Sequence, residues 1–364
     1  PAVSTSTDPS ITMGQYPFDM ADLMKKKVYI AYTGGTIGMR KTDEGYAPEC
    51  GYLAEQMAAM PELQNEQLPE YTIHEYPNLL DSANMTPKDW LMIAQDIAKN
   101  YNDYDGFIVL HGTDTMAYTS SALTFMLDGL EKPVILTGSQ IPLCEVRNDA
   151  RENIISAMMF ASHFAIPEVC LYFANHLFRG CRSTKIDADR LQAFASPNFP
   201  ALGTSGIKLE VHWENVRSYT APRNPLKVRE FINPAVGVLR LFPGISPKMV
   251  ENMLQPPIKG IVLEAFGIGN GPGNNPEFLK VLKKATDRGI VIVNCSQCLH
   301  GTVNMHEYST GNALSKAGLL SGHDMTTEAA LAKMFALFST DLPVERIKEL
   351  IQEDLRGELT PPSS

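Results

Sequence analysis

Short apolar runs alternate with amphipathic stretches along most of the chain. Each run is continuous in Val, Ile, Leu and aromatic residues, as is typical of strands buried on both faces of a parallel sheet. Strands and helices in alternation predict an α/β fold with a mostly parallel sheet. The predicted strands lie at residues 28–32, 107–111, 133–137, 169–174, 236–242, 260–266 and 290–295.

Two of the stretches between these runs carry clear helix signals. In residues 86–101, Thr86 is placed to cap a helix whose first position is proline, and apolar residues recur on one face. Residues 274–289 show the same pattern, with Asn275 as the N-terminal cap before a proline and Gly289 at the end of the helix. We therefore expect amphipathic helices to connect the buried strands.

The pattern is interrupted once, at residues 215–234, where prolines and charged residues replace it. We interpret this segment as a linker between a larger N-terminal α/β domain, residues 24–214, and a smaller C-terminal, Rossmann-like α/β domain, residues 235–364. Residues 1–23 show no sustained periodicity, and we interpret them as an extension or an expression remnant.

Composition narrows the class of ligand. With 364 residues, 44% of them hydrophobic, the chain is large enough for two ordinary domains. A net charge of −10 disfavours a broad basic surface for nucleic acid or anionic membrane. No apolar run approaches the roughly 20 residues that cross a bilayer, and a signal-peptide pattern is missing. We expect a cytoplasmic protein with a small ligand and with neither nucleic acid nor membrane as partner.

The cysteines and histidines give no metal or disulfide pattern. The 6 cysteines are scattered, which favours reduced thiols. Cys295 and Cys298 form a C-x-x-C with His300 nearby, but a zinc or redox site would need a second ligand pair or a helix start, so we favour buried thiols. Because the histidines also lack the H-E-x-x-H spacing, we predict no metal and no cofactor.

The loops after the predicted strands indicate the chemistry, because open α/β sheets bind ligands beyond the carboxyl ends of their strands. These loops are rich in hydroxyl, amide and glycine and nearly lack lysine and arginine. "TGGTIG" matches neither nucleotide-binding glycine motif, so a small polar organic substrate is favoured and nucleotide binding is the weaker alternative. The loops read TGGT (33–36), GTDT (112–115), GSQ (138–140), GIGNG (267–271) and SQC (296–298).

Two threonines in these loops are candidates for catalysis. A threonine hydroxyl such as that of Thr36 or Thr113 needs an activating partner, and tight glycine turns supply N–H donors for an oxyanion. Asp114 beside Thr113 is suited to hold an ammonium group or orient a lysine, and Lys185 is the candidate lysine if it is buried. In the alternative interpretation the threonines and Asp114 cap helices and Lys185 is solvated.

Four motifs in order, "YTGGTIG", "HGTDTMAYT", "RSTK" and "FASPN", resemble the asparaginase family. The resemblance covers nearly the whole chain, from Met24 to the closing "LRGELTP", and is strongest to the cytoplasmic, type I bacterial branch of this asparaginase/glutaminase family. It implies hydrolysis of L-asparagine to L-aspartate and ammonia without a cofactor.

The resemblance also implies catalytic roles. Thr36 would attack the side-chain amide carbon and form a β-aspartyl ester, and Tyr46, on a mobile lid that starts near Gly38, would activate or position it. Thr113, Asp114 and Lys185 would form a second group, in which Thr113 positions or activates the hydrolytic water. A glycine-flanked, charged segment suits a lid that excludes water during acylation.

Substrate binding and assembly are implied in the same way. Asp114 would also bind the α-ammonium of the substrate, and Ser82 its α-carboxylate, with Asp81 beside it. Each site would lie between the N-domain of one subunit and the C-domain of its neighbour, which implies a homodimer or a dimer of dimers, the homotetramer.

Some cytoplasmic members bind a second, regulatory asparagine. Thr184 and Cys298 resemble residues of that site, but Glu264 stands where a basic residue would meet the carboxylate of the ligand. Because two carboxylates repel each other, Glu264 argues against allosteric regulation by asparagine.

Two other functions stay open on the sequence. The first is a related amide-processing enzyme, a glutaminase or the subunit of an amidotransferase that passes ammonia to a partner enzyme. Such a subunit usually carries an added N-terminal domain, for which residues 1–23 are too short. The second is a non-catalytic small-molecule-binding protein, for which the hydroxyls of Thr36 and Thr113 would be dispensable.

Overall fold

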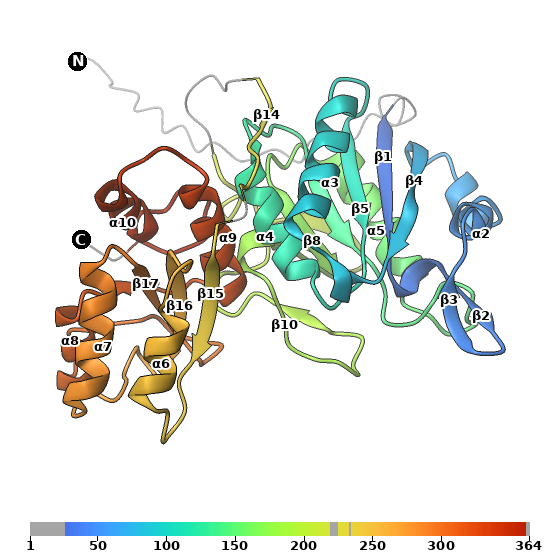
Figure 1. Cartoon of the computed structure of the whole chain (residues 1–364). Helices are drawn as coiled ribbons and strands as arrows, with labels where there is room; N and C mark the ends of the chain where they lie inside the picture. Colours follow the sequence, from blue (N-terminus) through green and yellow to red (C-terminus); the bar gives the residue numbers. More distant parts are fainter. Residues whose placement is uncertain (1–25, 219–224, 233, 362–364) are drawn as a thin grey trace, which may run out of the picture.

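The computed structural model describes residues 26–218, 225–232 and 234–361, so the proposed extension at residues 1–23 lies outside the described residues. The first two thirds of the chain form a large sheet with helices on both sides, and the last third forms a smaller sheet with its own helices (Figure 1). This confirms the predicted α/β class, with a larger, mostly parallel sheet and a smaller parallel one.

The larger sheet has eight strands. Five adjacent strands run parallel to one another, and the three strands at one edge are joined to them and to each other by antiparallel pairing. The four strands predicted in this part of the chain are confirmed as β1, β5, β7 and β8, with ends that differ by one or two residues. In spatial order the strands are β13 (Leu209–Val211), β12 (Gly203–Ser205), β9 (His176–Arg179), β8 (Val169–Phe173), β7 (Val134–Thr137), β5 (Gly106–Leu110), β1 (Lys27–Gly34) and β4 (Glu70–Leu80).

Both faces of this sheet are covered, which explains why its central strands are continuously apolar. Alternate side chains of β1 and β5 enter two separate cores, one under α3 and α4 and the other under α2 and α5. Figure 1 shows α3 and α4 on the near side of the sheet and α5 on the far side. These helices are α2 (Tyr52–Ala58), α3 (Pro87–Asn100), α4 (Met116–Met126) and α5 (Ala150–His163).

The two predicted helix starts are confirmed. The main-chain N–H and the hydroxyl of Thr86 both donate to the Asp89 carboxylate, at 2.8 and 2.6 Å, and close a capping box on α3. Asn275 accepts from the Phe278 N–H at 3.0 Å and caps the helix that follows. Gly289 has φ 88°, a left-handed conformation that ends the helix at low cost.

The smaller sheet is parallel throughout and is sandwiched between two helix layers. The three strands predicted here are confirmed, and a short fourth one is added. The strands are β15 (Val236–Arg240), β16 (Gly260–Ala265), β17 (Val291–Ser296) and β18 (Leu320–Ser321), and the helices are α6 (Pro247–Met253), α7 (Pro276–Asp287), α8 (Ser309–Lys316), α9 (Thr327–Phe338) and α10 (Val344–Gln352).

The segment predicted as the linker contains secondary structure where it is described. Within it, β14 (Lys227–Val228) pairs antiparallel with β6 (Leu127–Asp128) at the end of α4. Arg229 adds an ion pair to Asp128 at 2.6 Å. Part of the segment is therefore attached to the N-terminal half of the chain, and the domain boundaries stay predictions.

The predicted burial of the C-x-x-C thiols is wrong for one of them. All 6 cysteines are free, and Cys295 is buried at the centre of the smaller sheet, but Cys298 is exposed because it lies in the loop beyond β17. Within the described ranges, no group of three or more His, Cys, Asp or Glu side chains is placed to hold a metal ion.

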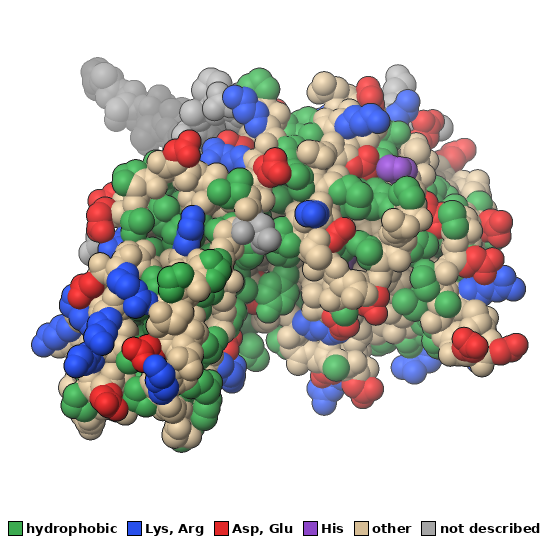
Figure 2. All heavy atoms as spheres, viewed as in Figure 1, with side chains coloured by type: hydrophobic (Ala, Val, Ile, Leu, Met, Phe, Trp, Pro, Cys, Tyr) green, Lys and Arg blue, Asp and Glu red, His purple; other side chains and the backbone are tan. Residues whose placement is uncertain are grey.

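The described helices are all too short or too polar to span a bilayer. On the face drawn in Figure 2, Lys and Arg side chains are interspersed with Asp and Glu over both sheets. This face therefore has no broad basic area of the kind that contacts a phosphate backbone.

Candidate active site

Three loops at the carboxyl edge of the larger sheet touch each other through glycine. A Cβ on Gly35 would lie 2.4 Å from the Gly112 nitrogen, and one on Gly112 would lie 2.5 Å from Ser82 Oγ. A Cβ on Gly34 would lie 2.3 Å from the Leu80 carbonyl oxygen. Only glycine allows such close approach, so these positions bring together the ends of β1, β4 and β5.

The two threonines of "TGGT" differ in their surroundings. Thr33 is buried, and its hydroxyl donates to the Leu110 carbonyl at 2.9 Å, which ties β1 to β5. Thr36 is half-buried and is the first residue of the short 3-10 helix Thr36–Gly38, whose N-cap is Gly35. Thr36 is therefore not a helix cap, and its position leaves the hydroxyl for another role.

Thr113, Asp114 and Lys185 form one hydrogen-bonded group. Lys185 Nζ donates to Thr113 Oγ1 at 2.9 Å and to Asp114 Oδ1 at 2.7 Å, although the chain positions lie 72 and 71 residues apart. Thr113 is buried, and the Lys185 side chain is 20% exposed. The alternative of a solvated lysine and two helix caps is thus wrong, because α4 begins after Thr115.

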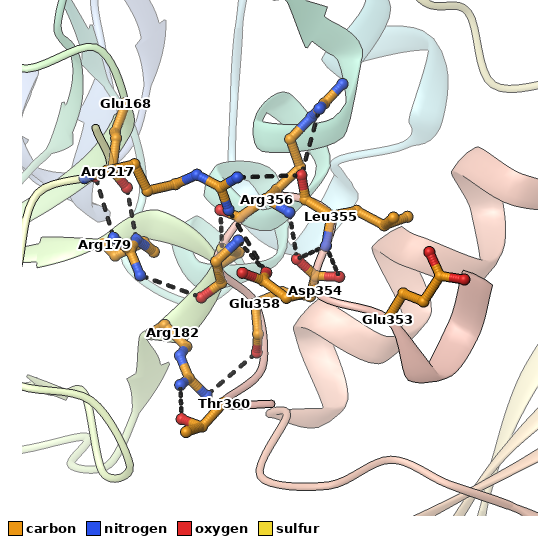
Figure 3. A network of polar contacts seen from close by, with 12 residues as sticks. Glu168, Arg179, Arg182, Arg217, Glu353, Asp354, Leu355, Arg356, Glu358 and Thr360 are labelled. Atoms are coloured by element: carbon orange, nitrogen blue, oxygen red, sulfur yellow. Dashed lines mark hydrogen bonds and ion pairs between the residues drawn. The ribbon is translucent and has the colours of Figure 1, made fainter. Parts of the chain in front are cut away.

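Lys185 follows a segment that is held by a buried polar network, in which Arg182 meets Glu358 and Thr360 (Figure 3). Lys185 lies in β10 (Thr184–Lys185), which follows the 3-10 helix Gly180–Arg182 after one residue. Within that helix, Arg182 is 2% exposed, pairs with Asp324 at 2.9 Å and donates to Thr360 Oγ1 at 2.6 Å. The strand that carries the lysine is therefore anchored to the C-terminal segment.

His111 supports the Gly112–Thr113 turn and was not among the residues predicted from the sequence. Its Nδ1 lies 2.7 Å from the Gly112 carbonyl oxygen, which only accepts, so Nδ1 carries the proton. Nε2 then accepts from the Thr119 hydroxyl at 2.8 Å, and Thr119 accepts from Trp90 Nε1 at 3.0 Å. Complete burial lowers the pKa of His111 to about 4 and keeps it neutral.

Ser82 and Asp81 lie at the end of β4, beside the threonine loops. Ser82 is buried, and its carbonyl accepts from the Thr115 hydroxyl at 2.7 Å. Asp81 is exposed and caps the 3-10 helix Ser82–Asn84 by accepting from the Ala83 N–H at 3.0 Å. The structure thus places Ser82 against the site and gives Asp81 a capping contact.

Tyr46 stands on a hairpin of β2 (Met39–Thr42) and β3 (Gly45–Pro48), which projects from the edge of the molecule in Figure 1. Its side chain is 46% exposed, and its hydroxyl donates to Glu145 Oε1 at 2.7 Å. This hydrogen bond raises the pKa of Tyr46. Among the described residues, Tyr46 is therefore hydrogen-bonded to Glu145 and not to Thr36.

The proposed regulatory residues meet at a separate cavity of about 180 Å³, which is lined by Thr184, Cys298 and Glu264. Thr184 Oγ1 donates to the buried Glu328 at 2.7 Å, and burial raises the pKa of that carboxyl. Arg240, the neighbour of Glu264 across β15 and β16, also lines the cavity and pairs with Glu264 at 3.1 Å. This arginine was not predicted from the sequence, because it comes from another strand.

Models of one protein family match both parts of the chain. The family model for the asparaginase N-terminal domain matches residues 27–217, and the glutaminase/asparaginase C-terminal domain model matches residues 235–351. The chain belongs to the asparaginase family. The predicted resemblance is confirmed for both parts of the chain.

Individual asparaginase-family members cover almost the whole chain. It is 50% identical to "L-asparaginase 1" of Escherichia coli over 93% of its own length and 99% of that relative. It is 44% identical to the "60 kDa lysophospholipase" of Mus musculus, of which it spans 64%. The solved structure of L-asparaginase I from Vibrio cholerae superposes with a TM-score of 0.86 at 50% identity and covers 92% of this chain and 99% of its own.

Proposed function

We propose that this protein hydrolyses L-asparagine to L-aspartate and ammonia. The observation that carries the proposal is the contact of Lys185 with both Thr113 and Asp114, next to the glycine turn that precedes Thr36. A relative named L-asparaginase 1 at 50% identity supports the same substrate.

In the acylation step we propose Thr36 as the nucleophile. Its oxygen attacks the side-chain amide carbon, the C–N bond breaks, and the nitrogen leaves as ammonia with the proton that the threonine loses. Main-chain N–H groups of the glycine turns are suited to stabilise the oxyanion. Tyr46 activates or positions Thr36 after it exchanges its hydrogen bond to Glu145 for one in the site.

In the deacylation step, water attacks the β-aspartyl ester carbon and the Thr36 oxygen leaves with a proton. We propose Thr113 as the group that positions this water, with the Lys185 ammonium and Asp114 holding the Thr113 hydroxyl in place. Apart from the attacking water, the groups in this scheme are side chains and main-chain N–H groups of the protein, so the proposed chemistry calls for no metal or cofactor.

The substrate contacts follow from the charges. The Asp114 side chain is 63% exposed, so it has lone pairs available for the α-ammonium of asparagine beyond its contact with Lys185. We propose the buried Ser82 for the α-carboxylate, with Asp81 at the rim. From the family resemblance we also propose that the protein assembles as a homodimer or a dimer of dimers. We propose a cytoplasmic location on the same ground.

We also propose that a second asparagine regulates the enzyme, and the position of Arg240 favours its binding. The expected repulsion by Glu264 is offset because Arg240 pairs with that carboxylate and lines the same cavity as Thr184 and Cys298. A guanidinium there is suited to the carboxylate of an amino acid. We therefore propose this cavity as the effector site.

The direct test is ammonia release from L-asparagine and L-glutamine at neutral pH over a wide concentration range. We expect asparagine turnover, and a loss of at least about 100-fold for Thr36→Ala and Thr113→Val, because each removes a group that acts on the reacting atoms. A sigmoidal rate curve would support the effector site. Full turnover by Thr36→Ala would refute the ester mechanism, and a strictly hyperbolic curve would refute the regulation.

A further inference from the structure

Gln140 contacts the proposed catalytic group and has no role in the scheme above. It lies in the loop after β7, and its side-chain Oε1 is 3.1 Å from Thr113 Oγ1. The other end of the same amide, Nε2, donates to the Arg190 carbonyl at 3.2 Å. Both ends of the side chain are therefore held.

The partners determine the direction of each hydrogen bond. The Arg190 carbonyl only accepts, so the NH2 of the Gln140 amide faces it and the amide oxygen faces Thr113. The Lys185 ammonium only donates, so it occupies one lone pair of Thr113 Oγ1. The hydroxyl proton of Thr113 therefore points to Gln140, and the second lone pair of its oxygen is left for another donor.

The main chain of Gln140 is fixed as well. Its N–H donates to the Asp149 carboxylate at 3.0 Å, and the Ile141 N–H donates to the same carboxylate at 2.9 Å. Asp149 directly precedes α5, a helix packed against the larger sheet. The amide oxygen is thus presented to Thr113 from a rigid support, as an orienting group requires.

We propose that Gln140 is a positioning residue for the hydrolysis of the ester intermediate. It holds the hydroxyl proton of Thr113 away from the site, so that the Thr113 oxygen accepts a hydrogen bond from the attacking water. A hydroxyl free to rotate would also donate to that water and withdraw electron density from its oxygen. The inference rests on the ester mechanism proposed above, and Gln140 itself exchanges no proton.

The test compares two nucleophiles that can cleave the ester intermediate. Water and hydroxylamine compete for it: each forms a bond to the carbonyl carbon, the Thr36 oxygen leaves with a proton, and the products are aspartate and β-aspartyl hydroxamate. Hydroxylamine is the stronger nucleophile and depends less on orientation by Thr113. In Gln140→Met, which keeps the length but not the amide, we expect the hydroxamate-to-aspartate ratio to rise about three- to tenfold.

Two further variants separate orientation from structure. Gln140→Glu still accepts from Thr113 although it no longer donates to Arg190, so its ratio should return to within about twofold of wild type. Gln140→Asn is too short to reach Thr113, and we expect it to behave like Gln140→Met if the latter folds poorly. The matched control is Gln64→Met, since the Gln64 amide meets the Ala58 carbonyl at 3.5 Å on the surface.

The outcomes distinguish this inference from the mechanism on which it rests. If wild type forms no hydroxamate, the ester mechanism and the role of Gln140 both fail. If wild type forms hydroxamate and the ratio is unchanged in both Gln140→Met and Gln140→Asn, only the role of Gln140 is refuted. A ratio that also rises in Gln140→Glu would assign the effect to the Arg190 contact and would overturn the proposal.

Discussion

His111 shows how much a single buried side chain contributes beside the catalytic turn. Each ring nitrogen has a defined partner, the Gly112 carbonyl on one side and the Thr119 hydroxyl on the other. An imidazolium would have to donate from both nitrogens, and the completely buried ring keeps its charge out of contact with bulk solvent. The ring therefore serves as a neutral brace between α4 and the turn that carries Thr113.

This neutrality predicts a pH dependence of stability. In the unfolded chain His111 binds a proton below about pH 6.5, whereas in the folded protein it stays neutral down to about pH 4. The unfolded state therefore binds more protons in this range, and the free energy of unfolding should fall as the pH falls from 6.5 to 4, by about 3 kcal/mol in total. Urea unfolding at several pH values measures this loss.

The control for this prediction is His111→Asn, whose amide keeps a donor near the Gly112 carbonyl but does not titrate. Because carboxylates also titrate in this range, the informative quantity is the difference between the two proteins. We expect the variant to be less stable at neutral pH and to lose less stability on acidification. Parallel curves for both proteins would show that His111 does not titrate as assigned.

At the scale of elements, the site depends on how closely three loops approach one another. The contact of Gly35 with Gly112 joins two main chains, so neither partner can move aside by a change of rotamer. Such a contact fixes the distance between the loops of Thr36 and Thr113. Enzyme rates are sensitive to displacements of about 1 Å, so the separation of these loops should control activity.

We expect Gly35→Ala to lower kcat/KM for asparagine by about 100-fold, because its Cβ would push the two loops apart. Part of its effect on stability comes from the left-handed backbone, with φ 90°. Gly289→Ala is the matched control, since Gly289 has φ 88° but nothing within 4 Å of the added Cβ. Gly289→Ala should be destabilised by about 1–2 kcal/mol through its backbone alone, and Gly35→Ala by more because of the added contact with Gly112. Only Gly35→Ala should lose activity.

The two measurements separate strain from displacement. Thermal unfolding reports the backbone strain that the two substitutions share, and steady-state kinetics report the distance between the loops. If Gly35→Ala kept wild-type kcat/KM, the close approach of the loops would not be needed for turnover. If Gly289→Ala lost activity to the same extent, backbone strain alone would account for the loss.

At the scale of the whole molecule, the C-terminal segment joins the two sheets through buried charges (Figure 3). Lys333 on α9 and Glu358 pair with both side chains fully buried, while Arg182 beside the catalytic strand holds Thr360. Burial raises the pKa of Glu358, but the Lys333 ammonium and main-chain N–H donors together outweigh it, so the pKa of this carboxyl is lowered. The segment around Glu358 and Thr360 is thereby fixed against the 3-10 helix that precedes the strand of Lys185.

Removal of one partner of this pair should be strongly destabilising. In Glu358→Gln the Lys333 ammonium stays buried without its counter-charge, and we expect a loss of about 3–5 kcal/mol in the free energy of unfolding. In the double variant Lys333→Met/Glu358→Leu no charge is left, so much of that loss should be regained. Urea denaturation midpoints compare wild type, Lys333→Met, Glu358→Leu and the double variant, with Glu358→Gln measured alongside. Purely additive losses in this cycle would contradict the assigned pairing.

Much of the fold followed from the sequence because its signals are local. Seven buried strands and two capped helices were predicted, since a continuous apolar run or a Thr-Pro pair acts within a few residues. The strands β4, β9, β12 and β13 were not predicted, because they are short or half-exposed and depend on their neighbours for pairing. Likewise the motif residues Thr113 and Lys185 were assigned roles from the sequence. His111 and Gln140 lie in the same motifs and loops but were assigned none, because their roles depend on tertiary contacts with Thr119 and Arg190.

The sequence by itself determined the α/β class, the family and the residue types at the site. Tertiary structure alone decided which of those residues meet: Lys185 reaches Thr113 across 72 positions, and Arg240 reaches Glu264 from the adjacent strand. It also decided that Tyr46 bonds to Glu145. The physical reason is that sheet register and glycine-mediated loop contacts set distances of a few ångströms between segments far apart in the chain, whereas propensity and capping act only between near neighbours.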